Sequence, residues 1–247
     1  ARVIDVPRLA ARDFQIDFDA LEKVIDQQAG VRLVFLTTPN NPTGDLVRRE
    51  DLERVLRVCE NKALVVLDEA YIEFCDSESA SELVGKWPQL VVLRTLSKAW
   101  AAAGVRCGIV IADEAIIALL RRVIAPYPLA ATAIDAALQA ISGEAITRQR
   151  QLVESVRQGR SELSAYLTKF SFVKKTWQSA ANFILLRVSD ARELVDWCAG
   201  RGIRIRDFSS QAQLEDCVRL TIGSSDELDE LKTTLQAYEE QRAGEGI

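Results

Sequence analysis

Residues 63–71 read ALVVLDEAY, an aliphatic run that ends in an acid. A short apolar run of this kind predicts a buried strand, here over Ala63–Leu67. Comparable runs predict further strands at Val31–Leu36, Leu90–Arg94 and Arg106–Ile111. The spacing of apolar residues in Arg49–Glu60 predicts an amphipathic helix. Buried strands that alternate with helical segments indicate an α/β fold with a mainly parallel sheet.

The second half of the chain has a different pattern. All six prolines lie within the first 128 residues, and helical periodicity dominates after Pro128. The spacing of Ile134, Leu138 and Ile141 predicts one helix, and Ile146–Lys169 predicts a longer one. The remaining runs predict strands at Ala181–Arg187, Ile203–Arg206 and Cys217–Ile222, and helices at Ala191–Arg201 and Asp226–Glu240. We therefore expect a large α/β domain over residues 1–144 and a small α+β domain over residues 145–247.

The composition excludes several kinds of chemistry. The chain has 247 residues, a formal net charge of −5 and no histidine. It therefore has neither a Ser-His-Asp triad nor a histidine-based zinc helix. Proton transfer near neutral pH must rest on Lys, Asp, Glu, Tyr, Cys or a cofactor. We expect no metal site.

The charge and cysteine patterns bear on partners and compartment. A mildly acidic balance without a basic tract argues against a nucleic-acid partner. The five cysteines are scattered and form no C-x-x-C, which favours a reducing compartment and a cytoplasmic location. The apolar stretch Ile109–Leu120 is interrupted by Asp113 and Glu114, so we expect no membrane span. Because methionine is absent, we expect that Ala1 is not the native start.

The segment TPNNPTG at residues 38–44 follows the first predicted strand. Its prolines, asparagines and glycine specify a rigid, irregular turn. Ligands bind at the carboxyl ends of strands in open α/β sheets, so an amide such as that of Asn41 would be placed to donate to a ligand oxygen. A plain tight turn explains the same residues, and turn chemistry alone favours that interpretation.

Asp68 and Tyr71 follow the strand predicted over Ala63–Leu67. An acid at the end of a buried strand is costly to desolvate unless a cation, a metal or a protonated ring nitrogen meets it. Tyr71 would bring a phenol to the same place. A solvated strand end or a helix N-cap explains Asp68 equally well.

The segment RTLSKA at residues 94–99 follows another predicted strand. Lys98 has Thr95 and Ser97 as hydroxyl neighbours and lies in an apolar stretch, where desolvation would favour a neutral, nucleophilic amine. The two hydroxyls and Arg106 would suit a phosphate. For a lone lysine, the favoured alternative is a snorkelling side chain on a surface turn.

The positions of the three motifs indicate a common site, because a parallel sheet would bring the carboxyl ends of its strands to one edge. An amine, an acid, a phenol, an amide and an arginine match pyridoxal phosphate, which carries an aldehyde, a ring nitrogen, a phenolic oxygen and a phosphate. In the second half, Arg206 and Arg219 near strand ends would clamp an anionic substrate. An exposed surface arginine is the favoured interpretation of each one alone.

In this order, PNNPTG, DEAYIEF, RTLSKAWAAAGVRCG and APYPL resemble the fold-type I pyridoxal-phosphate aminotransferases, over essentially the whole chain. DEAYIEF and APYPL resemble more narrowly the histidinol-phosphate group of that family. The resemblance implies a homodimer with a three-layer α/β/α large domain and a small α+β C-terminal domain. It also implies transamination of L-histidinol phosphate with 2-oxoglutarate to imidazole-acetol phosphate and L-glutamate, in L-histidine biosynthesis.

The same resemblance implies residue roles toward the cofactor, pyridoxal 5'-phosphate. Lys98 would be the catalytic lysine that bonds to the cofactor aldehyde, and Asp68 would keep the ring nitrogen protonated. Asn41 and Tyr71 would bind the 3-hydroxyl oxygen. The residues expected to bind the cofactor phosphate are Thr95, Ser97 and Arg106.

For the substrate, the resemblance implies that Arg219 binds the anionic group, with Arg206 and Asn182 in the same pocket. Family members also carry a further segment before the position of Ala1. It supplies a phosphate loop, an aromatic residue that stacks on the cofactor, and a tyrosine for the partner subunit's site. We therefore expect this chain to be the C-terminal portion of a longer protein.

Four other interpretations stay open. A related lyase of the threonine-phosphate decarboxylase group has close motifs, and an aromatic aminotransferase would use the same cofactor. An aminotransferase-like effector domain of a transcription regulator would need a DNA-binding module before Ala1. The chain would also fit an inactive fragment.

Overall fold

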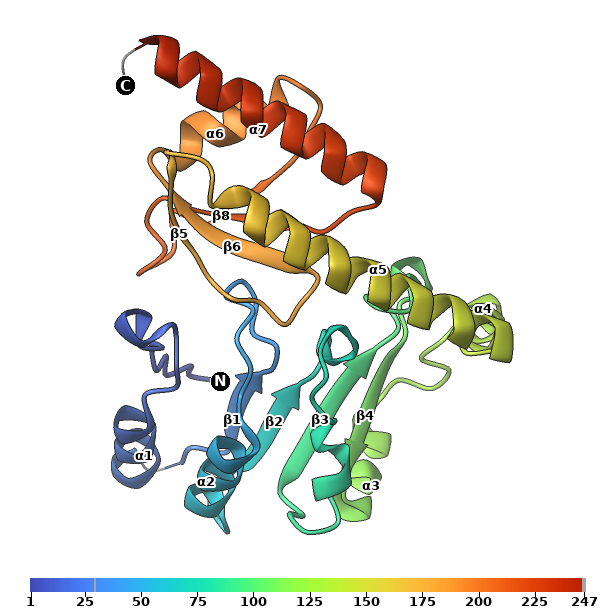
Figure 1. The fold of residues 1–247 in the computed structure, drawn as a ribbon. Coiled ribbons are helices and arrows are strands. Elements are labelled where there is room, and N and C mark those ends of the chain that lie inside the picture. The colour runs from blue at the N-terminus through green and yellow to red at the C-terminus, as the bar shows by residue number, and fades with distance from the viewer. Residues whose placement is uncertain (29, 246–247) are drawn as a thin grey trace. The chain divides into compact units, whose positions relative to one another are not determined.

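The computed structural model of the chain describes residues 1–28 and 30–245. These residues form two compact units. Unit 1 comprises Ala1–Asn40 and Asp45–Gln151, and unit 2 comprises Asn41–Gly44 and Leu152–Ile247. The long helix α5 (Gly143–Leu167) contributes residues to both units, and each unit has its own four-stranded sheet (Figure 1). The functional division into a cofactor-binding domain over 1–144 and a small domain over 145–247 stays a prediction.

The sheet of unit 1 has the strand order β1-β2-β3-β4. Its strands are β1 (Leu33–Thr37), β2 (Leu64–Asp68), β3 (Leu90–Thr95) and β4 (Gly108–Ala112). The first three strands pair in parallel, and β4 pairs antiparallel with β3. The sequence prediction of an α/β fold with a mainly parallel sheet is therefore confirmed.

The connection between β2 and β3 differs from the predicted alternation of strands and helices. It holds only two 3₁₀ turns, η2 (Ile72–Phe74) and η3 (Ala80–Leu83). The segment is rich in serine and acidic residues and ends near Pro88, so it lacks an apolar stripe long enough for an α-helix. A third turn, η4 (Ala103–Val105), precedes β4, and a fourth, η1 (Ala10–Arg12), lies near the N-terminus.

Two helices cover one face of this sheet, α1 (Phe18–Gln27) and α2 (Arg49–Cys59). Alternate residues of the first three strands pack against them in one buried cluster; these are Val34, Leu36, Val65, Leu67, Leu90 and Val92. On the opposite face of β1, Phe35 is 66% exposed. The best-buried part of unit 1 thus lies between the parallel strands and these two helices.

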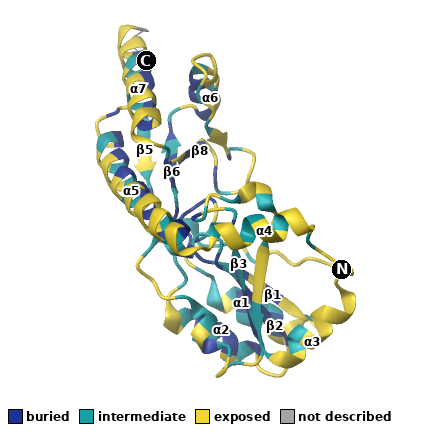
Figure 2. Cartoon of the chain, turned by 90° about the vertical axis from the view of Figure 1, so that its right-hand side faces the viewer, coloured by how far each residue is buried: buried dark blue, intermediate teal, exposed yellow. Residues whose placement is uncertain are grey.

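Two further helices of unit 1, α3 (Glu114–Val123) and α4 (Ala131–Ala140), carry many exposed side chains (Figure 2). Asp113 caps α3 by accepting the Ala115 N–H at 2.9 Å. The spacing of apolar residues predicts α4 but neither α1 nor α3. Among the described helices, none is long and apolar enough to cross a membrane.

The sheet of unit 2 is antiparallel, with the order β5-β6-β8-β7. Its elements are β5 (Val173–Thr176), β6 (Phe183–Val188), α6 (Ala191–Ala199), β7 (Arg206–Asp207), β8 (Cys217–Thr221) and α7 (Ser225–Glu245). The predicted strand over Ile203–Arg206 is wrong in extent, because pairing with β8 begins only at Arg206. The predicted α+β architecture of the C-terminal part is confirmed.

The five cysteines give a test of the two cores. None of the five forms a disulfide bond, and burial raises the pKa of Cys59 and of Cys198 to about 11. The thiolate form of cysteine is the nucleophile that reacts with thiol reagents, so a raised pKa slows the reaction. We expect iodoacetamide at neutral pH to modify Cys59 and Cys198 at least about tenfold more slowly than the partly exposed Cys75 and Cys107.

Mass spectrometry of timed digests measures these rates. In denaturant, where burial is lost, the same thiols should react at similar rates. Equal labelling of Cys59 and Cys75 in the folded protein would contradict the described core.

Candidate active site

The parallel pairing of β2 with β3 places functional groups at one edge of the sheet in unit 1. Asp68 is the last residue of β2 and pairs in register with Leu93. Thr95 is the last residue of β3, and Gly108 at the start of β4 lies opposite it. The turns that follow β2 and β3 and precede β4 therefore meet at this edge.

The Asp68 carboxylate is fixed by its own turn. Its Oδ1 accepts the Ala70 N–H at 2.9 Å, and its carbonyl oxygen accepts the Thr38 N–H at 2.9 Å. Asp68 is partly buried. An oriented carboxylate of this kind can meet a positively charged group at the edge of the sheet.

The Lys98 amine lies over the ring of Tyr71, with its Nζ 5.2 Å from the ring centre. This contact joins the turn after β3 to the turn after β2. Lys98 is exposed, so the expectation of an apolar, desolvated surrounding is not met. Ala101 and Ala103, which follow it in sequence, are themselves exposed and do not cover it. The amine is accessible to a reactive carbonyl group.

Hydrogen-bonding groups cluster beside Lys98. The Thr95 and Ser97 hydroxyl oxygens lie 2.9 Å apart, and the Ser97 N–H donates to Thr95 Oγ1 at 3.1 Å. Arg106 adopts a left-handed backbone conformation (φ 58°), and its Nη1 donates to the Ala103 carbonyl at 3.2 Å. Hydroxyls, a backbone N–H and an exposed guanidinium suit a phosphate.

Unit 2 brings together a second set of the predicted residues. Arg206 of β7 lies directly opposite Arg219 of β8, so both side chains project from the same face of the sheet. Arg219 Nη1 donates to Asn41 Oδ1 at 2.7 Å, and its guanidinium carbon lies 4.8 Å from the centre of the Phe183 ring. Asn182 is placed next to the sheet, where its carbonyl accepts the Ile222 N–H at 2.9 Å.

The loop that carries Asn41 is held by Gly44, whose φ is +79°. The Gly44 carbonyl accepts the Ala180 N–H at 2.8 Å. A Cβ on Gly44 would come within 2.3 Å of the Ser179 hydroxyl and 2.9 Å of its Cα. Glycine is therefore required here both for its backbone conformation and for this close approach.

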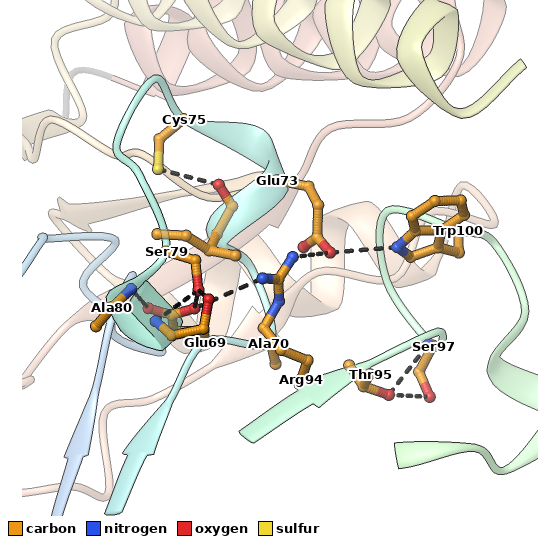
Figure 3. Close-up of polar contacts among 12 residues, drawn as sticks. Glu69, Ala70, Glu73, Cys75, Ser79, Ala80, Arg94, Thr95, Ser97 and Trp100 are labelled. Atoms are coloured by element: carbon orange, nitrogen blue, oxygen red, sulfur yellow. Dashed lines mark hydrogen bonds and ion pairs between the residues drawn. The ribbon is translucent and has the colours of Figure 1, made fainter. Parts of the chain in front are cut away.

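Four residues near the site are not predicted from the sequence pattern: Glu69, Glu73, Arg94 and Trp100. They form ion pairs and hydrogen bonds that join the segment after β2 to strand β3 and to Trp100 (Figure 3). The signal available in the sequence was the pair of acids on either side of Tyr71. Their partners lie about twenty residues further along, which a linear pattern does not reveal.

The fold is α/β, and this sheet edge carries an exposed lysine amine together with a carboxylate, a phenol and two adjacent hydroxyls. The family described as aminotransferase class I and II matches residues 1–235. The chain belongs to this family.

Among the members of this family, histidinol-phosphate aminotransferases are similar to this chain. Histidinol-phosphate aminotransferase of Pectobacterium atrosepticum is 40% identical over 225 residues, which are 91% of this chain and 62% of that protein. The chain thus spans about three-fifths of the length of such curated relatives.

Solved structures have the same fold. The histidinol-phosphate aminotransferase from Clostridium acetobutylicum superposes with a TM-score of 0.85 at 26% identity, over 93% of this chain and 69% of that one. The enzyme from Sinorhizobium meliloti, solved in complex with pyridoxal-5'-phosphate, gives a TM-score of 0.83 at 25% identity, over 94% of this chain and 62% of that one. These matches confirm the fold of the pyridoxal-phosphate aminotransferases.

A substitution at Gly44 tests the loop that carries Asn41. We expect Gly44→Ala to lower the free energy of unfolding by about 2–4 kcal/mol, through backbone strain and overlap with Ser179. Gly202→Ala is the matched control, because Gly202 has φ +81° but open space around its Cβ position. Its cost should be only about 1 kcal/mol. Denaturant titration measures both values, and equal losses would show that the contact with Ser179 contributes nothing.

Proposed function

We propose that the protein carrying this chain catalyses pyridoxal-phosphate-dependent transamination of L-histidinol phosphate with 2-oxoglutarate, giving imidazole-acetol phosphate and L-glutamate in L-histidine biosynthesis. The observation that carries the proposal is the exposed Lys98 amine, which lies over Tyr71 and beside the Thr95 and Ser97 hydroxyls. The names of the relatives support the choice of substrate.

The groups at the edge of unit 1 fit pyridoxal phosphate in their chemistry. An accessible primary amine suits an aldehyde, and two adjacent hydroxyls with an exposed guanidinium suit a phosphate. Asp68 would face the ring nitrogen, while Tyr71 and Asn41 would bind the ring's phenolic oxygen. When bound, the cofactor supplies an aldehyde that condenses with amines and a ring that accepts electrons.

The residues of the chain have separate tasks in this proposal. Lys98 would hold the cofactor at Nζ, and the same nitrogen would carry the substrate proton as a general base and acid. Asp68 would favour a proton on the ring nitrogen through its negative charge. With Lys98 and Asp68 in these roles, a chain without histidine would be able to transfer protons near neutral pH.

Arg219 and Arg206 have the geometry to bind an anionic substrate group. They oppose each other on neighbouring strands, which places two positive charges on one face of the sheet of unit 2. A guanidinium pairs bidentately with either a phosphate or a carboxylate, so the same groups serve L-histidinol phosphate and 2-oxoglutarate. We include Asn182 in the same substrate pocket.

The proposal extends to assembly and location. We infer a homodimer, since the family resemblance implies one, with residues 1–144 as the cofactor-binding domain and residues 145–247 as the small domain. The five free thiols support a reducing compartment such as the cytoplasm.

Lysine substitution tests the proposed function in the complete protein that contains these residues. Borohydride reduction after incubation with pyridoxal phosphate should attach the cofactor to the peptide with Lys98, as read by mass spectrometry. Lys98→Ala should abolish this adduct and lower glutamate formation from L-histidinol phosphate and 2-oxoglutarate by at least about 1,000-fold.

Lys86→Ala is the control, because Lys86 is an exposed lysine over a tryptophan ring and pairs with Glu53. It should leave the adduct intact and glutamate formation within about twofold, as for an ordinary surface substitution. Glutamate formation that survives Lys98→Ala would rule the assignment out. Carbon dioxide release in place of glutamate would identify a lyase instead.

A further inference from the structure

A network of buried and partly buried charges joins the segment after β2 to strand β3 and to the turn that follows it. The Arg94 guanidinium lies between Glu69 and Glu73, as Figure 3 shows. Arg94 Nη2 donates to Glu73 Oε1 at 2.7 Å, and Arg94 Nη1 lies 3.7 Å from Glu69 Oε2. Trp100 Nε1 also donates to Glu73 Oε1, at 3.2 Å. One carboxylate oxygen of Glu73 therefore holds both Arg94 and Trp100.

The far side of the network is fixed by Glu69. This carboxylate is 1% exposed, and it accepts the Ser79 hydroxyl at 2.6 Å and the Ala80 N–H at 2.7 Å. Burial raises the pKa of Glu69, while the hydrogen bonds and Arg94 oppose that rise. Because Glu69 has little freedom to move, it gives Arg94 a fixed anchor.

The members of this network are close in sequence to the reactive groups. Glu73 is two residues after Tyr71, and Trp100 is two residues after Lys98. Arg94 directly precedes Thr95, the last residue of β3. The bond between Trp100 and Glu73 thus ties the turn that carries Lys98 to the turn that carries Tyr71.

The turn that carries Lys98 is held by the buried side chains of Leu96 and Ala99 and by hydrogen bonds of its backbone. The Ala101 N–H donates to the Lys98 carbonyl at 3.0 Å, and the Ala102 N–H donates to the Leu96 carbonyl at 3.0 Å. Ala101 has a positive φ of 52°, which is unfavourable for alanine. The Trp100 indole adds a side-chain hydrogen bond from this turn to Glu73, on the turn after β2.

We infer that Glu73 is a positioning residue, which acts through Trp100 and Arg94 to hold the Lys98 amine over Tyr71. This inference rests on the proposed function of Lys98. Glu73 does not touch the reacting groups, and its effect is to set the geometry from which Lys98 transfers a proton. A displacement of about 1 Å at a reacting group can cost up to about a hundredfold in rate.

Three substitutions in the complete protein separate the contacts. Trp100→Phe removes only the indole N–H that donates to Glu73, and Glu73→Ala removes the shared acceptor. Glu73→Gln keeps an oxygen at the same place and should restore the geometry. The control is Trp197→Phe, which removes an indole N–H bond of 3.1 Å to the Thr234 carbonyl in unit 2.

The first readout needs no cofactor. Hydrogen exchange by mass spectrometry in the cofactor-free protein reports the Ala101 and Ala102 amides of the Lys98 turn. We expect their exchange to speed up at least about tenfold in Trp100→Phe and Glu73→Ala, because the turn opens locally, and to change less than about twofold in Glu73→Gln and Trp197→Phe.

The second readout is the split between kcat and KM for L-histidinol phosphate. We expect Trp100→Phe and Glu73→Ala to lower kcat at least about tenfold and to leave KM within about twofold, because substrate binding depends on other residues. A role in stability alone would instead lower the melting temperature in step with Trp197→Phe and leave kcat unchanged.

The outcomes separate failure of this inference from failure of the proposed function. If Trp100→Phe matches the unaltered protein in amide exchange and in kcat, the inference is overturned while Lys98 keeps its role. If the unaltered protein forms no cofactor adduct at Lys98, the proposed function fails, and the inference fails with it. If Glu73→Ala does not fold, Trp100→Phe and Glu73→Gln still decide the question.

Discussion

The parallel pairing of β2 with β3 is the constraint on which the site in unit 1 depends. The register sets Asp68 against Leu93, so both strands end at nearly the same level. Asp68 ends β2, Tyr71 lies in the turn that follows it, and Lys98 lies in the turn after β3, so the groups proposed for the chemistry come from neighbouring strands. A shift of one residue in this register would reverse the side-chain directions along a strand and separate these groups.

Much of this arrangement could be predicted from the sequence, because short runs of valine and leucine identify buried strands and strand ends are where ligands bind. The sequence could not predict the exposure of Lys98. Apolar neighbours along a chain do not bury a side chain unless they fold back over it, and Ala101 and Ala103 point to solvent instead. The contact of Lys98 with Tyr71 likewise depends on tertiary structure.

Contacts distant in sequence explain the other failures of prediction. Asn41 and Arg219 are 178 residues apart in sequence, and their hydrogen bond lies within unit 2. The two-residue strand β7 forms because Arg206 and Asp207 pair with β8, and two residues carry no periodicity.

Helix α3 is not predicted for a different, local reason. Its sequence is apolar over several consecutive residues, which is also typical of a buried strand.

The charges behind the site in unit 1 are costly to bury, and stability is a poor explanation for them. Desolvating Glu69 and Arg94 consumes much of the attraction between them, and apolar residues of similar size would give comparable stability. Apolar residues would not provide directional hydrogen bonds. A carboxylate oxygen that accepts from both Arg94 and Trp100 fixes two turns to a single point, and packing of alkyl groups allows them to slide. The network thus specifies a geometry, with an amine held over a phenol ring, on which the proposed proton transfer by Lys98 would depend.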